Sequence, residues 1–176
     1  MRHLTYPTTS LFEYLPVRYT ATPEQQHNRS EIYSFKDGNC SERVYRGLLL
    51  KIKEIIGYNP KNWVVTFIPG STTARTISKY KRLAIRLAGD INATVSLTAI
   101  YNKTERQSTI VTGKLSDPTV TFGFNVNEFS GKRVILIDDV ITTGRSFQKC
   151  GDKMKANGAT GIYGLFVGNT INPDWN

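Results

Sequence analysis

One stretch of the chain, residues 134–146, constrains the fold more than any other. Its first four residues, Val-Ile-Leu-Ile, are apolar and mostly β-branched, which is typical of a strand buried on both faces. Two carboxylates, Asp138 and Asp139, stand where this strand is expected to end. A turn of mostly small residues follows before a helical pattern begins: Thr142, Thr143, Gly144, Arg145 and Ser146. Such a turn offers N–H groups to an anion, while carboxylates accept hydrogen bonds from sugar hydroxyls or hold a divalent cation.

Composition narrows the class of protein. The chain has 176 residues, enough for one domain with its own core, and no apolar run long enough to span a membrane. The first residues contain no apolar signal core, so we expect a cytoplasmic protein in which Cys40 and Cys150 are thiols. The net charge of +9 is spread along the chain, which favours a solvated surface plus a phosphate pocket over a nucleic-acid tail.

Residues 1–30 are polar, interrupted by prolines and without periodicity. We expect an N-terminal arm packed on the surface, with a cap over a ligand pocket, part of a small hood, as the alternative. Tyr14, Leu15 and Val17 favour a short strand against the body. His3 and His27 lie in this arm with no partner at metal-ligand spacing, so neither is expected to bind metal.

From about residue 31 to 168, strand and helix patterns alternate, which predicts an α/β domain (residues 31–176) with a mainly parallel, twisted sheet flanked by helices. Strands are expected at residues 32–35, 63–68, 93–101, 119–122, 134–137 and 161–167. Helices are expected at residues 42–57, after Thr73, and at 145–156. Ser41 reads as an N-cap, and Gly57 and the pair Asn157-Gly158 read as helix ends.

A second turn of the same kind follows the strand predicted at residues 63–68. It consists of Pro69, Gly70, Ser71, Thr72 and Thr73. In an open parallel sheet, ligands bind beyond the carboxyl ends of the strands, so two such turns can hold the two ends of one polyanion. The alternative is an ordinary connection. The helix that follows is expected to bury Ile77, Tyr80, Ala84, Leu87 and Ala88, and to keep Arg75, Lys79, Lys81, Arg82 and Arg86 largely off that face.

Residues 102–130 are the least regular part of the chain and contain Lys103, Arg106 and Lys114. A connection of this length is usually functional or disordered. A basic loop that follows a strand could close over a substrate and exclude water, and a plain surface excursion is the alternative.

Residues 134–146 resemble the phosphoribosyl-pyrophosphate (PRPP) binding motif of type I phosphoribosyltransferases, with four apolar residues, two acids, two apolar residues and a Thr/Gly-rich loop. The preceding Gly131-Lys-Arg-Val is also similar to these enzymes. The competing interpretation, a Walker-B-like strand, requires a G-x-x-x-x-G-K-[ST] loop, which the chain lacks. The resemblance covers about residues 40–168 and implies a type I phosphoribosyltransferase-like fold.

The resemblance also implies roles for individual residues. Asp138 and Asp139 would bind the ribose 2- and 3-hydroxyls, directly or through Mg²⁺ and its waters. Residues 142–146 would hold the 5-phosphate, and residues 69–73 stand where the pyrophosphate loop of the family stands. Lys103 and Arg106 would belong to a flexible catalytic loop. In the family, pyrophosphate leaves Mg-bound PRPP as an amine or base nitrogen attacks C1 of the ribose.

The subfamily is indicated by the departures from the motif. Hypoxanthine/guanine enzymes usually carry an acid where this chain has Thr142, and residues 102–108 do not look like the Lys- and Gly-rich loop of orotate enzymes. The nearest resemblance is to ComF-like proteins, which share Asp-Asp-Val-Ile-Thr-Thr-Gly and a similar Ile-Pro-Gly-Ser turn. This chain lacks their Cys-rich zinc-binding front end.

Two classes of function follow. The first is a transferase that uses PRPP, Mg²⁺ and an unidentified nucleobase or amine, as a default homodimer. The second is a non-catalytic PRPP sensor or a nucleic-acid-associated, competence-type protein. The acid pair and the basic loop favour catalysis. The acceptor would be recognised by the N-terminal arm or the tail, where Trp175 either stacks on a base or simply packs.

Overall fold

The computed structural model describes residues 4–103 and 121–175, and its centre is a five-stranded sheet. Every neighbouring pair of strands is parallel, in the order β1-β7-β6-β2-β3. The strands are β1 (Thr8–Tyr14), β2 (Trp63–Phe67), β3 (Thr94–Val95), β6 (Arg133–Ile141) and β7 (Gly161–Thr170). A separate antiparallel pair is formed by β4 (Ile100–Asn102) and β5 (Phe122–Phe124). The predicted α/β fold with a mainly parallel sheet is confirmed.

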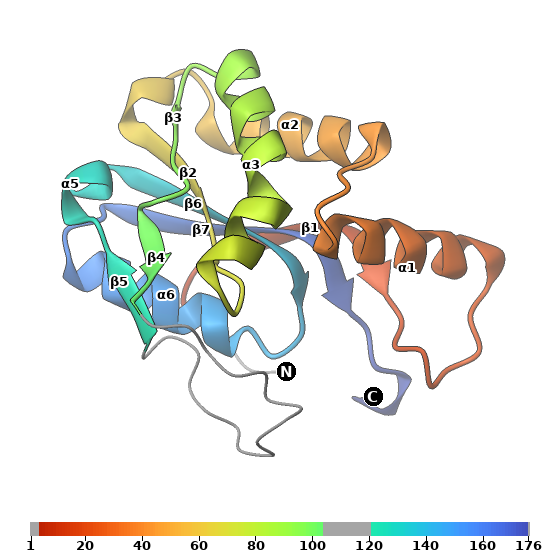
Figure 1. Ribbon diagram of the computed structural model, residues 1–176. Coiled ribbons are helices and arrows are strands. Elements are labelled where there is room, and N and C mark those ends of the chain that lie inside the picture. The colour runs from red at the N-terminus through yellow and green to blue at the C-terminus, as the bar shows by residue number, and fades with distance from the viewer. Residues whose placement is uncertain (1–3, 104–120, 176) are drawn as a thin grey trace.

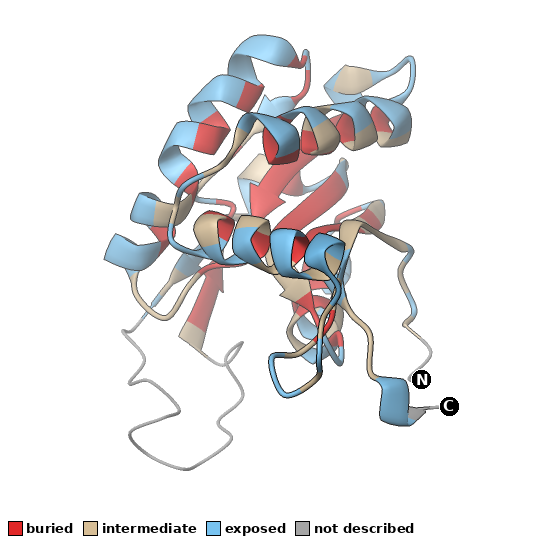
Figure 2. Ribbon diagram, turned by 90° about the vertical axis from the view of Figure 1, so that its right-hand side faces the viewer, coloured by how far each residue is buried: buried red, intermediate tan, exposed pale blue. Residues whose placement is uncertain are grey.

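Helices cover both faces of the sheet (Figure 1). One face carries α1 (Pro23–Lys36), α2 (Glu42–Ile56) and α3 (Thr73–Asp90), and the other carries α5 (Val126–Phe129) and α6 (Arg145–Ala156). Two 3₁₀ turns complete the described elements, η1 (Pro60–Asn62) and η3 (Pro173–Trp175). Along β6, Ile135 and Ile137 pack into the core under α1–α3, whereas Val134 and Leu136 pack towards α6. The strand is therefore buried on both faces, as predicted, and Figure 2 shows the buried sheet between exposed helix surfaces.

Local capping explains where the long helices begin. Thr22 and Gln25 form a capping box at α1, Ser41 caps α2 and Thr72 caps α3. The helix α6 begins after Gly144, whose φ of 69° is left-handed, and no side chain caps it. The helices predicted at residues 42–57 and 145–156 are confirmed, including the end of α2 at Gly57.

The strand predicted at residues 32–35 is wrong, because these residues belong to α1. The helix starts at the Thr22 capping box with Pro23 in its first turn, and Ile32 and Phe35, three residues apart, are both buried on its inner face. The strand of the N-terminal region also lies earlier than expected, at Thr8–Tyr14, and Val17 is 67% exposed. The helix α1 runs across the predicted boundary between residues 30 and 31.

The strand predicted at residues 93–101 is divided into β3 and β4. A turn separates them because the Ser96 hydroxyl accepts hydrogen bonds from the backbone N–H groups of Thr98 and Ala99, at 3.0 and 2.8 Å. Residues 119 and 120 of the strand expected at 119–122 lie outside the described residues, and the strand observed next in the chain is β5, Phe122–Phe124. Part of the segment expected to be irregular is therefore regular, since β5 and α5 both lie within it.

Two expectations from composition concern membrane spans and cysteines. Within residues 4–103 and 121–175, no helix combines the length and the apolar character needed to cross a membrane. Cys40 and Cys150 are both thiols, as predicted.

Candidate functional site

The acid pair lies at the carboxyl edge of the sheet, where two neighbouring strands end at different points. β2 stops at Phe67, opposite Ile137, while β6 continues beside β7 as far as Ile141. The prediction that the strand ends at the acids is therefore wrong, because pairing with β7 prolongs it. Asp138 and Asp139 consequently lie beyond the end of β2, and their side chains are 21% and 17% exposed.

The side chain of Lys79, from α3, bridges the two carboxylates. Its Nζ lies 3.0 Å from Oδ1 of Asp138 and 2.9 Å from Oδ2 of Asp139. The Tyr80 hydroxyl donates a further hydrogen bond of 2.8 Å to Oδ1 of Asp138. The backbone N–H of Asp139 donates to the same Oδ1 of Asp138 at 2.8 Å, and the backbone N–H of Val140 donates to Oδ1 of Asp139 at 2.7 Å. The hydrogen bonds to Asp138 therefore converge on one oxygen, whereas those to Asp139 involve both oxygens.

Sequence reasoning missed Lys79 by placing it largely off the buried face of α3. The buried residues of this helix are Thr76, Tyr80, Leu83, Ala84 and Leu87, whereas Ile77 is 47% exposed and Ala88 is exposed. Position 79 lies three residues after Thr76 and four before Leu83, so it belongs to the buried stripe. That spacing is the signal that could have identified Lys79, whose side chain is only 11% exposed.

Two aromatic rings also lie close to the ammonium. Nζ of Lys79 lies 4.7 Å from the ring centroid of Tyr80 and 5.9 Å from that of Phe35. The Tyr80 ring stacks on Phe67, with centroids 4.6 Å apart. The lysine is therefore positioned by the core as well as by the carboxylates.

The electrostatics of this cluster set its protonation states. Burial alone would lower the pKa of Lys79, but the nearby carboxylates outweigh it and the pKa is raised, so the side chain is an ammonium at neutral pH. Burial raises the pKa of Asp138, and Lys79 opposes the rise. Burial and the neighbouring carboxylates raise the pKa of Tyr80 well above 10.0, which keeps its hydroxyl a donor.

The turn predicted to hold the 5-phosphate encloses a cavity of about 220 Å³ next to Asp138. All five residues of the turn line it, together with Ile68 from the end of β2. The α6 end of the turn offers N–H groups that no side chain caps, since Gly144 replaces the usual capping residue. The structure thus brings together one of the two predicted acids and residues 142–146 around one space.

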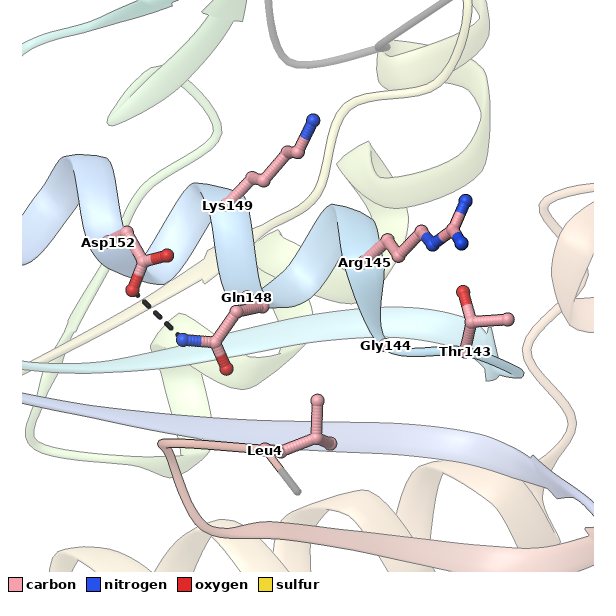
Figure 3. Close-up of a pocket in the computed structure, with 7 residues that line it drawn as sticks. All are labelled: Leu4, Thr143, Gly144, Arg145, Gln148, Lys149 and Asp152. Atoms are coloured by element: carbon pink, nitrogen blue, oxygen red, sulfur yellow. Dashed lines mark hydrogen bonds between the residues drawn. The ribbon is translucent and has the colours of Figure 1, made fainter. Parts of the chain in front are cut away.

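A second cavity, of about 460 Å³, is lined by the C-terminal half of the same turn, by the first turns of α6 and by Leu4 of the N-terminal arm (Figure 3). The residues lining it are Leu4, Thr143, Gly144, Arg145, Gln148, Lys149 and Asp152. In Figure 3 the side chains of Arg145 and Lys149 extend away from Leu4. The N-terminal arm is attached here, because the backbone N–H of Thr5 donates to Gln148 at 3.0 Å and the Tyr6 hydroxyl donates to Asp152 at 2.9 Å.

The second predicted anion turn, residues 69–73, lies at the same edge of the sheet but uses part of its hydrogen-bonding capacity internally. The N–H of Gly70 donates to the Thr76 hydroxyl at 3.0 Å, and the amide of Asn102 donates to the carbonyl of Gly70 at 3.1 Å. The Thr72 hydroxyl accepts the N–H of Arg75 at 3.1 Å. The turn is therefore tied to the start of α3 and to β4. Ser71 is half-buried and Thr73 is exposed.

The remaining predicted site residues lie apart from this cluster or outside the described residues. Lys103 is exposed at the end of β4, where its backbone N–H donates to the carbonyl of Thr121 at 2.8 Å. Arg106, Lys114 and His3 lie outside the described residues, as does the side chain of Trp175. Nε2 of His27 lies 3.7 Å from Oε1 of Glu31, and both residues belong to α1.

The donor set suits a divalent cation delivered by a ligand. Among residues 4–103 and 121–175, no cluster of three or more His, Cys, Asp or Glu side chains could hold a metal by itself. Asp138 and Asp139 nevertheless converge on one cation, the ammonium of Lys79, with one oxygen each within 3.0 Å. Carboxylate oxygens are the ligands Mg²⁺ prefers, usually one or two of them with substrate oxygens and water, so the pair fits a shared magnesium ion.

Sequence comparisons find local relatives. No protein-family model matches the chain. A stretch of 56 residues is 41% identical to a Streptococcus pneumoniae protein named "Putative ribose-phosphate pyrophosphokinase 2" and covers 29% of this chain and 18% of that protein. A protein of the same name from Streptococcus agalactiae is 39% identical over 51 residues, which cover 26% and 16% of the two chains. The matched region is thus less than a fifth of the length of these relatives.

Solved structures with similarity to this chain include several phosphoribosyltransferases. A hypoxanthine-guanine phosphoribosyltransferase of Bacillus anthracis is 19% identical, with 77% of this chain and 68% of that chain covered and a TM-score of 0.41. Adenine phosphoribosyltransferase of Saccharomyces cerevisiae is 18% identical, with coverages of 73% and 70% and a TM-score of 0.43. Both TM-scores are below 0.5, so these similarities assign no function to this chain.

Proposed function

We propose that the chain is a Mg²⁺-dependent phosphoribosyltransferase that uses PRPP. The observation that carries the proposal is the cavity at the carboxyl edge of the sheet, lined by Asp138 and by every residue of the turn 142–146. A carboxylate that accepts sugar hydroxyls and a helix start that offers N–H groups are the two features a ribose 5-phosphate requires. Asp138 and the start of α6 both border this cavity, so they could contact the hydroxyls and the phosphate of one ribose 5-phosphate.

The residues of the chain divide the work as follows. Asp138 and Asp139 hold the ribose 2- and 3-hydroxyls, and residues 142–146 hold the 5-phosphate with N–H groups and hydroxyls. Residues 69–73 and the start of α3 face the pyrophosphate, whose negative charge is favoured at a helix N-terminus. Mg²⁺, held at the acid pair directly or through water, would supply charge neutralisation for the departing pyrophosphate. The protein thereby fixes C1 of the ribose between the leaving group and the attacking nitrogen.

The finer assignment is a ComF-like phosphoribosyltransferase, supported by Asp-Asp-Val-Ile-Thr-Thr-Gly at residues 138–144. The streptococcal relatives are named as ribose-phosphate pyrophosphokinases, which agrees with a ligand that contains ribose phosphate. Thr142, where hypoxanthine/guanine enzymes usually have an acid, argues against those acceptors. We propose another nucleobase or an amine as the acceptor, recognised by the parts of residues 1–30 that lie outside β1 or by the C-terminal tail. We further propose that the chain is a cytoplasmic homodimer.

A second candidate function is a non-catalytic PRPP sensor. It is favoured by the internal hydrogen bonds of residues 69–73, because the N–H groups of Gly70 and Arg75 already have acceptors. A sensor can hold the ribose phosphate without stabilising departing pyrophosphate. A nucleic-acid-associated role depends on the +9 charge alone and predicts binding that falls steeply with salt.

The test is a panel of nucleobases and amines incubated with Mg-PRPP and read by release of pyrophosphate. We expect one acceptor in the panel to cause release of pyrophosphate from PRPP. We expect Asp138→Asn and Asp139→Asn each to lower the rate of this release about 100-fold or more. Asp37→Asn, at an exposed position after α1, is the matched control and should leave the rate unchanged. Calorimetric binding of PRPP without any release would favour the sensor, and absence of PRPP binding would overturn the proposal.

A further inference from the structure

We propose that Lys79 is a built-in counter-cation of the acid pair, and that a divalent metal ion binds Asp138 and Asp139 by displacing it. The inference deepens the proposed function, since it concerns how the same site accepts the metal that accompanies PRPP. It assigns to Lys79 a positioning role that the PRPP motif does not contain, because this residue comes from a different helix, α3.

The geometry supports direct competition between Lys79 and a metal. The ammonium lies 3.0 and 2.9 Å from one oxygen of each carboxylate, which is the position where a shared cation interacts with both. A Mg²⁺ ion bound to the same two oxygens requires distances of about 2.0–2.1 Å to each direct ligand. Two cations cannot share these two oxygens at such distances, so a metal ion that binds both of them requires that the ammonium leave.

Charge balance explains why the exchange can proceed. Lys79 contributes one positive charge against two carboxylates, which leaves the cluster with one net negative charge. With the acid side chains only 21% and 17% exposed, uncompensated charge is unfavourable, and a doubly charged ion compensates it fully. The metal ion therefore neutralises the negative charge that Lys79 leaves uncompensated.

The lysine can leave without movement of its helix. Its charge stands at the end of a flexible four-carbon side chain, whereas the neighbouring Tyr80 is fully buried and stacked on Phe67. α3 directly follows residues 69–73, the turn proposed to face the pyrophosphate. A displaced ammonium would thus stay beside the polyanion that arrives with the metal, and the site would favour metal and PRPP together over metal alone.

The experiment measures binding of Mn²⁺, used as a probe for Mg²⁺, to the chain without PRPP, by electron paramagnetic resonance. Lys79→Gln keeps a hydrogen-bond donor and removes the charge, so we expect it to bind Mn²⁺ about tenfold more tightly than the unmodified chain. Lys79→Arg keeps the charge and should bind no better than the unmodified chain. Lys81→Gln, at an exposed position on the same helix, is the matched control and should show no change.

Thermal unfolding with and without MgCl₂ provides the second measurement, because a ligand that binds the folded state raises its stability. We expect MgCl₂ to raise the Tm of Lys79→Gln more than that of the unmodified chain. A Lys79→Gln chain that binds Mn²⁺ no better than the unmodified chain, or that stays unfolded at every Mg²⁺ concentration, would overturn the inference.

Calorimetry with PRPP on the unmodified chain separates this inference from the proposed function. PRPP binding combined with unchanged metal affinity in Lys79→Gln would overturn the displacement and leave the PRPP site intact. Tighter Mn²⁺ binding in Lys79→Gln combined with no PRPP binding would support the displacement and overturn the PRPP site.

Discussion

The two turns at the carboxyl edge of the sheet have similar compositions but use their backbone N–H groups differently. The turn between β2 and α3 satisfies its own groups, with Thr72 capping the helix and Thr76 accepting the N–H of Gly70. The turn between β6 and α6 enters its helix through Gly144 and has no side-chain cap. The first turn therefore stabilises the fold by itself, and the second leaves donors directed at a cavity.

The difference also divides the roles of the two helices. α6 contributes its N-terminal backbone to the site, whereas α3 contributes a side chain, Lys79, from its second turn. Thr, Ser and Gly in a βα turn are consequently compatible with two outcomes, a self-capped turn or an anion site. Which outcome occurs depends on whether one hydroxyl reaches the N–H groups of the first helical turn.

The largest expected difference in stability between the two turns comes from replacing their glycines, Gly144 and Gly70, by alanine. Gly144 has a φ of 69°, and a Cβ there would lie 2.6 Å from Cδ2 of Leu4, so Gly144→Ala should lower the free energy of unfolding by about 1–2 kcal/mol. It should also weaken PRPP binding, because the turn 142–146 must shift. Gly70→Ala should change stability by less than about 0.5 kcal/mol, since its Cβ would meet no atom closer than Cβ of Arg75 at 3.4 Å. Urea denaturation and calorimetry measure both, and equal effects at the two positions would contradict the comparison.

Tyr80→Phe tests the support that α3 gives to the acid pair. The ring can keep its stack on Phe67, but the 2.8 Å hydrogen bond to Asp138 is lost. We expect a loss of about 1–1.5 kcal/mol in the free energy of unfolding. Tyr58→Phe, at a fully exposed position, serves as the control in the same denaturation experiment. A loss no larger than that of the control would show that the hydroxyl is dispensable.

Exchanging a threonine for alanine in each turn should separate stability from binding. Thr72→Ala removes the cap of α3 and should lower stability by about 1 kcal/mol, with PRPP affinity less affected. Thr143→Ala, at an exposed position in the uncapped turn, should leave stability within about 0.5 kcal/mol and weaken PRPP binding. If Thr72→Ala and Thr143→Ala changed stability and PRPP affinity in the same way, the two turns would not differ in function.

The smallest expected effect is a pH dependence that belongs to Lys79. Its pKa is raised in the folded chain, so its stabilising contribution is complete below the ordinary value of 10.5 and is lost as the pH rises through the folded pKa. The difference in unfolding free energy between the unmodified chain and Lys79→Gln should thus be constant at neutral pH and shrink above about pH 10.5. The pKa of Tyr80 is also raised, so its contribution is lost in a similar pH range, and the same comparison made in chains that carry Tyr80→Phe removes that contribution. A difference that stays constant above pH 11 would contradict the assignment.

Local signals were sufficient for much of the fold. Ser41 and Gly57 mark the ends of α2, and the apolar run before Asp138 identifies the central strand. Both signals come from residues that are adjacent in the sequence, so they can be recognised without the tertiary structure. The strand predicted at residues 32–35 shows the opposite case. The short apolar pattern there is compatible with a strand, but the capping box at Thr22, ten residues earlier, starts a helix that runs through the region.

The site was predictable where one segment supplies it and incomplete where two segments meet. Asp138 and the turn 142–146 belong to one motif, and the structure places them around one cavity. Lys79 lies 59 residues from Asp138 in the sequence, and only the packing of α3 on Phe35 and Phe67 brings it to the acids. Packing between distant segments places Lys79 beside the acids, so its position cannot be predicted from the charges of neighbouring residues in the sequence.

The pairing of β1 with β7 has a consequence for how the chain folds. Thr8 lies beside Gly164 in a parallel register, so the first strand to be synthesised completes the sheet only after the last described strand has been made. Contacts between such distant segments form late, since they carry the largest loop-closure entropy. Until then β7 presents an unpaired edge, which is where a nascent or partly folded chain would pair with another copy of itself.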